Sequence, residues 1–218
     1  VKRDEHGKLL PLQSYDETIR RGMRFLLDDH AKWFKGPPES LLDEKGQTQM
    51  PWVYYSNLQQ NGAPFTSGPD RFVSYPAFHH ALNIKTFLRH WKTFGDQSAL
   101  DQAVALADWN IAHSTPTDWP YAGLPWSTFL EKKPGGFRDK SGLMPDKAAI
   151  MALAYLQLYD ATGEKRFLEA ATAIGRSLAA RQRPNGTWPF RVDPKTEEVI
   201  EDYSSSVIYA VMLFESLD

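Results

Sequence analysis

Apolar positions recur at helical spacing in two ways along this chain. In three segments they form one stripe with polar residues elsewhere, which is typical of helices that cover a core from one side. Two others are apolar almost all round, which indicates inner helices, and a more polar segment takes the same place earlier in the chain. The stripes are Ile19, Met23 and Leu26, then Leu100, Val104, Ala107 and Ile111, then Phe167, Ala171, Ile174 and Leu178, and the inner segments are 75–91, 148–156 and 207–214.

The two kinds of helix alternate, and the connections between them differ in length. Short turns around Gly95 and Gly163 lead from an inner helix to the next outer one. The connections from outer to inner helices are long, at about 35–74, 114–143 and 184–202. Because alternate connections lie at opposite ends of a helical layer, the three long loops are predicted to share one face. Long loops without structure of their own are usually functional.

Parts of this pattern repeat. The segment 90–96 corresponds to 158–164, and Asp-Trp-Pro-Tyr at 118–121 corresponds to Thr-Trp-Pro-Phe at 187–190. A weaker third copy lies at 50–54.

This alternation, with Trp-Pro-Tyr/Phe after each of the last two outer helices, resembles the α/α-toroid or six-hairpin architecture of many glycoside hydrolases and polysaccharide lyases. The segment 184–190, Pro-Asn-Gly-Thr-Trp-Pro-Phe, is similar to the repeat turns of such proteins. The resemblance covers about 15–218 and leaves 1–14 as an N-terminal extension. It implies an all-α fold and a ligand cleft at the long-loop mouth, lined by the starts of the inner helices.

Length and composition narrow the function classes. The 218 residues carry a formal net charge of -2, so the chain has no electrostatic reason to bind nucleic acid or an acidic membrane. The absence of cysteine excludes disulfides and thiolate sites, no long apolar run predicts a membrane span, and no motif predicts a metal or another cofactor. The start at Val1, without Met, leaves the compartment open: a signal peptide has been removed or was never included, and only its removal would slightly favour a periplasmic or secreted protein.

The length also bears on the architecture. At roughly 60–70 residues per outer-plus-inner unit, the chain holds three units, and a closed ring of this kind needs about twice as many. The prediction is therefore a piece of a longer chain, or an arc that another copy closes as a homo-oligomer. An open arc leaves apolar flanks exposed.

Aromatic residues, carboxylates and arginines gather in the long loops. Rings that stack on sugar C–H faces, mixed with polar groups that bind hydroxyls, are typical of carbohydrate sites. For Trp119 and Trp188, which recur in the repeat, packing at the end of the helices is an equally good interpretation. The candidate substrate-binding residues are Trp52, Tyr54, His79, Trp119, Tyr121, Trp126, Arg138, Trp188, Arg191 and Tyr203.

Three aspartates are the candidate catalytic residues, because a glycoside hydrolase needs two carboxylates about 5–10 Å apart. Each has a structural alternative. Asp146, in the first turn of an inner helix, can complement the helix dipole, Asp202 can cap a helix, and Asp139 can pair with Arg138 on the surface.

Two other functions fit the same face. A polysaccharide lyase acting on a uronate-containing glycan needs a Tyr or His base with cationic groups, and His79, His80, Tyr75, Tyr203, Arg138 and Arg191 supply such a set. Of the adjacent histidines at most one can face the cleft, because neighbours on a helix point about 100° apart. A non-catalytic scaffold would use the rings to bind a glycan or a protein. The first prediction is a glycoside hydrolase acting on an oligo- or polysaccharide.

Overall fold

The computed structural model describes residues 3–8, 14–29, 73–74, 76–127, 129–130, 133–134, 136–137 and 140–218, with the side chains of 28–29, 73–74, 76 and 129–141 excluded. Helices dominate these residues, and their order is the predicted one. The division into an extension at 1–14 and a domain at 15–218 stays a prediction. The helices are α1 (Tyr15–Arg24), continued by the π-helical turn η1 (Phe25–Asp29), α4 (Pro76–Phe94), α5 (Gln97–Ala112), α6 (Pro145–Thr162), α7 (Lys165–Ala179) and α8 (Val207–Leu217).

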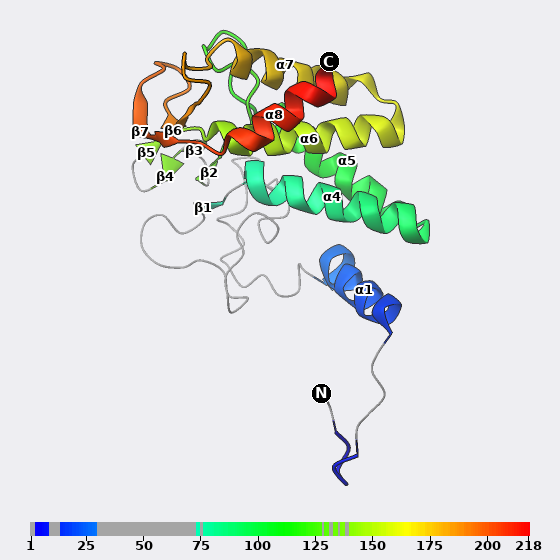
Figure 1. Ribbon diagram of the computed structural model, residues 1–218. Coiled ribbons are helices and arrows are strands. Elements are labelled where there is room, and N and C mark those ends of the chain that lie inside the picture. The colour runs from blue at the N-terminus through cyan, green and yellow to red at the C-terminus, as the bar shows by residue number, and fades with distance from the viewer. Residues whose placement is uncertain are drawn as a thin grey trace.

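The helices form two layers (Figure 1). Helix α6 packs between α4 and α8 in the inner layer, while α5 packs on α4 and α7 packs on α6 from outside. All three inner helices begin at the side of the molecule where the strands lie. The prediction of an all-α chain with inner and outer helices is confirmed for the described residues, and the second and third long loops share one face, while most of the first long loop lies outside the described residues. Within this part of the chain, no helix is long and apolar enough to cross a membrane.

Tight glycine turns join the inner helices to the outer ones. Gly95 and Gly163 have φ angles of +71° and +73°, in the left-handed region that glycine adopts without a Cβ clash. The Gly163 amide donates to the carbonyl of Tyr159 at 2.7 Å and closes α6. At the next helix start, Asp96 caps α5 by accepting a hydrogen bond from the Ser98 amide at 3.1 Å. Both turns are thus built from residues close together in the sequence.

Short strands within the long loops add to the predicted architecture. In the third loop, β6 and β7 form an antiparallel hairpin in which Arg191 lies opposite Glu201. Leu143, just before α6, exchanges two backbone hydrogen bonds with Val192 at 2.7 and 3.0 Å, so the hairpin is fixed to the start of an inner helix. The strands are β1 (Val73–Ser74), β2 (Phe129–Leu130), β3 (Lys133–Pro134), β4 (Gly136–Phe137), β5 (Lys140–Ser141), β6 (Pro189–Val192) and β7 (Val199–Ser204).

The core lies between the two helical layers. The predicted stripe of α7 is fully buried, whereas in α5 the face toward the core is shifted: Ala99, Ala103 and Leu106 are buried with Ala107. The larger residues of the predicted stripe, such as Leu100, pack at the edge of the core. Small side chains at the contact allow close approach of α5 to α4. In α5 the hydrophobic period therefore predicts the helix but places its buried face about one residue off, whereas in α7 it predicts the buried face correctly.

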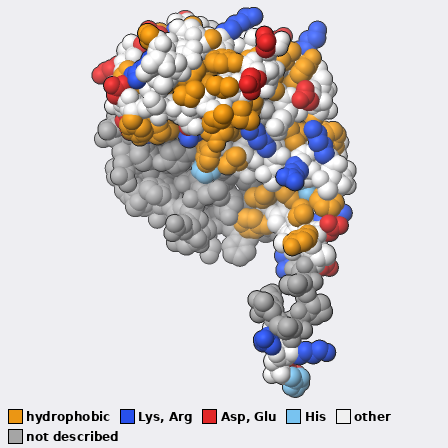
Figure 2. Space-filling view, viewed as in Figure 1, with side chains coloured by type: hydrophobic (Ala, Val, Ile, Leu, Met, Phe, Trp, Pro, Cys, Tyr) orange, Lys and Arg blue, Asp and Glu red, His pale blue; other side chains and the backbone are white. Residues whose placement is uncertain are grey.

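One flank of the inner layer is open to solvent. Ile208, Val211 and Met212 of α8 are exposed, and Figure 2 shows hydrophobic side chains gathered over this helix. Their spacing of three and four residues makes them one stripe. An exposed flank of this kind is what the sequence predicts for an arc of helices.

Candidate functional site

The start of α6 is capped by residues from two long loops. The N-cap residue Met144 has no side-chain acceptor to offer. Instead, the Met144 amide donates to Ser127 Oγ at 2.7 Å, and the Asp146 amide donates to Ser205 Oγ at 3.1 Å. Free amides of a first helical turn need such acceptors when they are buried. The second and third long loops therefore meet at the first turn of the central inner helix.

Asp146 is the buried carboxylate of this end. Its side chain is 4% exposed, and Oδ2 accepts a hydrogen bond from Lys147 Nζ at 2.7 Å. The other oxygen, Oδ1, is buried and has no hydrogen-bond partner in the described part of the chain. Buried carboxylate oxygens are costly to leave without a donor, so an unsatisfied one marks a position where a ligand hydroxyl or proton can bind. The structure also agrees with the alternative interpretation of Asp146, because its negative charge lies in the first turn of α6, at the positive end of the helix dipole.

A series of contacts leads from Asp146 to the neighbouring inner helix. Lys147 Nζ lies 5.1 Å from the centre of the Phe78 ring, and the Phe78 and His79 rings are 5.3 Å apart. Burial lowers the pKa of His79 below its ordinary value, so its imidazole is neutral near pH 7. The first turns of α4 and α6 thus bring a carboxylate, an ammonium group and a neutral imidazole to the same end of the layer.

The neighbouring histidine has a different role. His80 is fully buried, its Nδ1 accepts a hydrogen bond from Asn110 Nδ2 at 2.8 Å, and its ring meets Trp109 edge-on. Burial lowers the pKa of His80 to about 3. His80 is therefore a packed residue between α4 and α5, and the two histidines point apart as helical geometry requires.

The hairpin contributes an arginine held against a carboxylate. Arg191 is buried, and its Nε lies 2.7 Å from Glu201 Oε1 in an ion pair whose angle is not that of a hydrogen bond. Tyr203 Oη donates to the second oxygen of Glu201 at 3.0 Å. A Cβ on Gly142 would lie 2.6 Å from Arg191 Cγ, so glycine is needed beside this arginine. Arg191 is thereby fixed along the segment that leads into α6.

An aromatic pair with one exposed ring, Tyr203, lies on the same hairpin. The rings of Phe190 and Tyr203 stack with centres 4.3 Å apart and an angle of 20° between their planes. Tyr203 is 59% exposed. Among the predicted substrate-binding rings that the structure describes, Tyr203 is the most exposed, and it is therefore available for stacking on a sugar.

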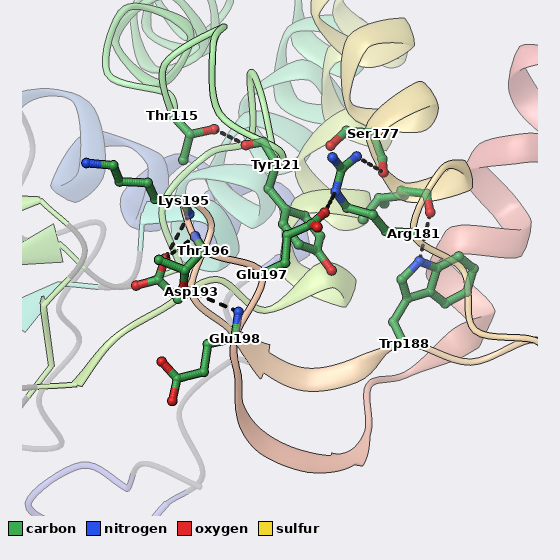
Figure 3. A network of polar contacts seen from close by, with 11 residues as sticks. Thr115, Tyr121, Ser177, Arg181, Trp188, Asp193, Lys195, Thr196, Glu197 and Glu198 are labelled. Atoms are coloured by element: carbon green, nitrogen blue, oxygen red, sulfur yellow. Dashed lines mark hydrogen bonds and ion pairs between the residues drawn. The ribbon is translucent and has the colours of Figure 1, made fainter.

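Other predicted rings lie in the core, which corrects the expectation that they bind substrate. Trp188 is 1% exposed, and its indole Nε1 donates to the Leu178 carbonyl at 2.9 Å (Figure 3). Trp126 is also buried: its carbonyl accepts from the Ala77 amide at 3.1 Å, and its ring meets Trp119 edge-on at 6.2 Å. For Trp188 the structure agrees with the alternative interpretation, packing at the end of the helices, and Trp126 is buried although the sequence offered no such alternative for it.

Tyr121 ties two long loops together and is likewise buried. The Arg181 guanidinium lies 4.9 Å from its ring centre, and Arg181 Nε bonds Glu197 Oε1 at 2.6 Å (Figure 3). The Tyr121 amide donates to the Pro194 carbonyl at 3.2 Å, and burial raises the pKa of its phenol. Tyr121 thus fixes the tip of the hairpin to the second loop instead of facing a ligand.

Of the remaining predicted site residues, the structure describes Asp202, and the others lie outside the described residues. Asp202 lies on β7 with a 79% exposed side chain that pairs with Arg183, so its interpretation as a helix cap is wrong. Ser206 occupies the N-cap position of α8. Trp52, Tyr54, Arg138 and Asp139 lie outside the described residues and stay predictions, as does Tyr75.

The sequence analysis did not identify three residues that contact the first turn of α6, namely Lys147, Ser127 and Ser205. Lys147 follows Asp146 directly, which is a usable signal, whereas Ser127 and Ser205 act from distant loops and carry none. Among the described residues, no group of three or more His, Asp or Glu side chains is placed to hold a metal ion.

Comparison with known proteins gives structural matches only. No family model and no curated protein matches the chain. A solved D-mannose isomerase matches with a TM-score of 0.59 and 17% identity over 93% of this chain and 51% of that chain. A sugar epimerase from a ruminal bacterium matches with a TM-score of 0.54 and 11% identity, over 93% and 47% of the two chains. The chain spans about half the length of these proteins, and it has the α/α-toroid fold.

Proposed function

We propose that this protein processes a carbohydrate that binds at the N-terminal ends of α4, α6 and α8. One observation carries the proposal: the Asp146 carboxylate is buried at the end where the long loops meet, with one oxygen bound by Lys147 and the other left without a donor among the described residues. The fold supports it, because the solved structures that match the chain include a sugar epimerase and a D-mannose isomerase. Fold alone does not name a reaction, so the chemistry rests on the residues.

The described groups suit proton transfer on a free sugar. Isomerisation and epimerisation remove a proton from the carbon beside a carbonyl and return one to carbon. In isomerisation the proton returns to the neighbouring carbon and a second proton moves between the two oxygens, whereas in epimerisation it returns to the same carbon from the opposite face. Asp146 and the neutral His79 are two groups able to accept and deliver protons, and they lie on neighbouring inner helices. Lys147 holds the carboxylate and supplies a positive charge beside developing oxyanion charge. Tyr203 supplies an exposed ring for stacking.

Hydrolysis of a glycosidic bond is the second candidate function. It needs a second carboxylate on the same face. Glu201 is only partly exposed, is held by Arg191 and Tyr203, and precedes by a few residues the serine that caps Asp146. Asp139, predicted from the sequence for this role, lies outside the described residues.

The decisive experiment measures deuterium incorporation and glycosidic bond cleavage in the same samples. The protein is incubated in D₂O with a panel of aldoses, ketoses and oligosaccharides, uronate-containing oligosaccharides included, and proton NMR records deuterium incorporation at C1 or C2 together with new reducing ends. Deuterium at C1 or C2 of a free sugar supports isomerase or epimerase chemistry. New reducing ends without deuterium support hydrolysis, and absorbance of an unsaturated uronate identifies a lyase. Sugar binding with none of these products contradicts the enzyme proposal and leaves the glycan-binding scaffold.

A further inference from the structure

A concave site lies at the end of the helical layer opposite Asp146, between α1 and the turn that joins α4 to α5. It is a pocket of about 360 Å³, within the size range of small-molecule sites. His90 lies about 16 Å along α4 from His79 at the helical rise of 1.5 Å per residue, so this pocket is separate from the Asp146 end. Its lining residues are Arg20, Met23, Arg24, Leu27, His90, Asp96 and Ser98.

Two guanidinium groups give the pocket its charge. Arg20 and Arg24 are four residues apart on one face of α1, and both line the pocket. Neither is paired with a carboxylate in the part of the chain that the structure describes. The Arg20 guanidinium lies 4.3 Å from the centre of the Phe94 ring, which holds it toward the end of α4. Like charges facing one small space repel each other unless an anion lies between them.

A buried polar atom points to the same conclusion. The His90 side chain is 4% exposed, and its Nε2 lies 3.2 Å from Asp96 Oδ2. Its other ring nitrogen, Nδ1, is buried and has no hydrogen-bond partner among the described residues. Buried polar side-chain atoms are normally satisfied, so a ring that lines a pocket and keeps one nitrogen unpaired points to a ligand that binds there.

The one carboxylate of the described lining is already engaged. Asp96 Oδ1 accepts from the Ser98 amide at 3.1 Å and from Ser98 Oγ at 2.6 Å. These bonds to Ser98 keep the pKa of Asp96 below its ordinary value, with smaller support from His90. One ionised carboxylate against two guanidinium groups leaves the pocket positive, and the N-terminus of α5 adds partial positive charge.

We propose that this pocket binds the phosphoryl group of a small phosphorylated metabolite. The planar guanidinium group of arginine matches the geometry of phosphate oxygens. Two guanidinium groups also balance the charge of a phosphate dianion better than that of a single carboxylate ligand. The volume exceeds that of a phosphate ion, and Met23 and Leu27 provide an apolar wall for a small organic body such as a sugar. The ligand would join α1 to the α4–α5 turn.

The test uses inorganic phosphate and a hexose 6-phosphate at fixed ionic strength, with binding followed by calorimetry and phosphorus NMR. The wild-type protein is expected to bind both probes. The pair Arg20→Gln and Arg24→Gln should weaken binding about tenfold or more, because each arginine supplies charge-assisted hydrogen bonds. The control Arg21→Gln changes an exposed arginine of the same helix outside the pocket and should leave affinity unchanged. Tighter binding of the hexose phosphate supports a phosphosugar, and equal affinities support a site for the phosphoryl group itself.

A folding control accompanies the binding data. Circular dichroism and the unliganded melting temperature show whether each variant keeps its helices. If the glutamine pair loses helix, the pair Arg20→Lys and Arg24→Lys keeps charge and helix propensity but lacks the planar fork, and its affinity should fall severalfold. Absence of phosphate binding by the wild type, or equal affinity in wild type and in a folded double variant, would overturn the proposal.

Discussion

The two ends of the helical layer are built by contacts of very different range. At the short-turn end, the Gly163 amide donates to the Tyr159 carbonyl at the end of α6, and the Ser98 amide donates to Asp96 at the start of α5. In both bonds donor and acceptor are only a few residues apart in the sequence. At the long-loop end, the first turn of α6 depends on Ser127 and Ser205, which are 17 and 59 residues from their donors. Local contacts specify where helices end, whereas the remote contacts exist only once the loops are in place.

This difference explains why the two ends hold different chemistry. The turn at Gly163 is closed by a backbone hydrogen bond to Tyr159 and needs no partner from another segment. The remotely capped end buries the Asp146 carboxylate against Lys147, whose ammonium group lies over the Phe78 ring of α4. Changes at the short-turn end should therefore affect stability, and changes at the long-loop end should affect activity as well.

The largest effect is expected from removing the buried carboxylate. Asp146→Asn should lower the rate of the proposed proton transfer by about 10²–10⁴-fold, the usual contribution of a general acid or base. The rate of deuterium incorporation or product formation measures it. Asp160→Asn, an exposed aspartate near the other end of the same helix, is the matched control. Equal rates in the wild type and in a folded Asp146→Asn variant would remove Asp146 from the reaction.

The next effect concerns the core beneath the hairpin. Trp188→Ala should lower the free energy of unfolding by about 3–5 kcal/mol, because it leaves a cavity where a fully buried ring packed. It also leaves the Leu178 carbonyl without its indole donor. Urea unfolding measures the change, and Trp188→Phe should cost less because it keeps most of the ring volume. A small loss for the alanine variant would show that the hairpin is not packed on the core in this way.

A pH dependence of stability is expected from the buried histidine at the long-loop end. The pKa of His80 is about 3 in the folded protein and about 6.5 when unfolded, so only the unfolded state gains this proton between those values. Stability should therefore fall as pH decreases below 6.5, by about 1.4 kcal/mol per pH unit for one proton, and His79 acts in the same direction. Unfolding curves between about pH 6.5 and about pH 5 measure the slope. His80→Gln should flatten it, while the exposed control His6→Gln should not.

At the short-turn end, Gly163→Ala should cost about 1–2 kcal/mol of stability. The φ of +73° puts a Cβ in the disfavoured left-handed region, although the surrounding space is open. Thermal or urea unfolding measures the loss. Turnover per folded molecule should be unchanged, and a drop in turnover would contradict the separation between the two ends.

The smallest loss of stability is expected from removing the Ser205 hydroxyl, and this change should also lower activity. Ser205→Ala removes the acceptor of the Asp146 amide and should cost about 1 kcal/mol, as the loss of a helix cap does. Because the same bond positions the first turn of α6, turnover should fall severalfold as well. Ser216→Ala, an exposed serine that bonds within α8, is the control for loss of a hydroxyl. A Ser205→Ala variant that is less stable but fully active would show that the cap does not position Asp146.

Within the described residues, the sequence predicted the order of the helices correctly but not the strands that form in the loops between them. Glycines at 95 and 163 and the apolar runs placed the inner and outer helices, because helical period and left-handed turns are local properties. The same reasoning put Asp146 at the start of an inner helix. It did not predict the hairpin of β6 and β7, whose strands pair across a turn and against Leu143.

Burial of individual side chains was decided by tertiary structure. Trp119 and Trp188 lie in equivalent sequence segments, yet Trp188 is in the core and Trp119 is only partly buried. His79 and His80 are adjacent, yet one lies near Lys147 and Phe78 while the other packs on Trp109. A residue type in a pattern states what a side chain can do, and only its neighbours from other segments determine whether it meets solvent, core or ligand.

The sequence alone therefore determined the alternation of inner and outer helices, the tight turns and the presence of a carboxylate at the start of α6. The tertiary structure alone decided that this carboxylate is buried, that serines from two loops cap its helix, and that two arginines of α1 face His90 across a pocket. The physical reason is range. Backbone conformation and periodicity depend on near neighbours, while burial and charge environment depend on segments that meet only in the folded chain.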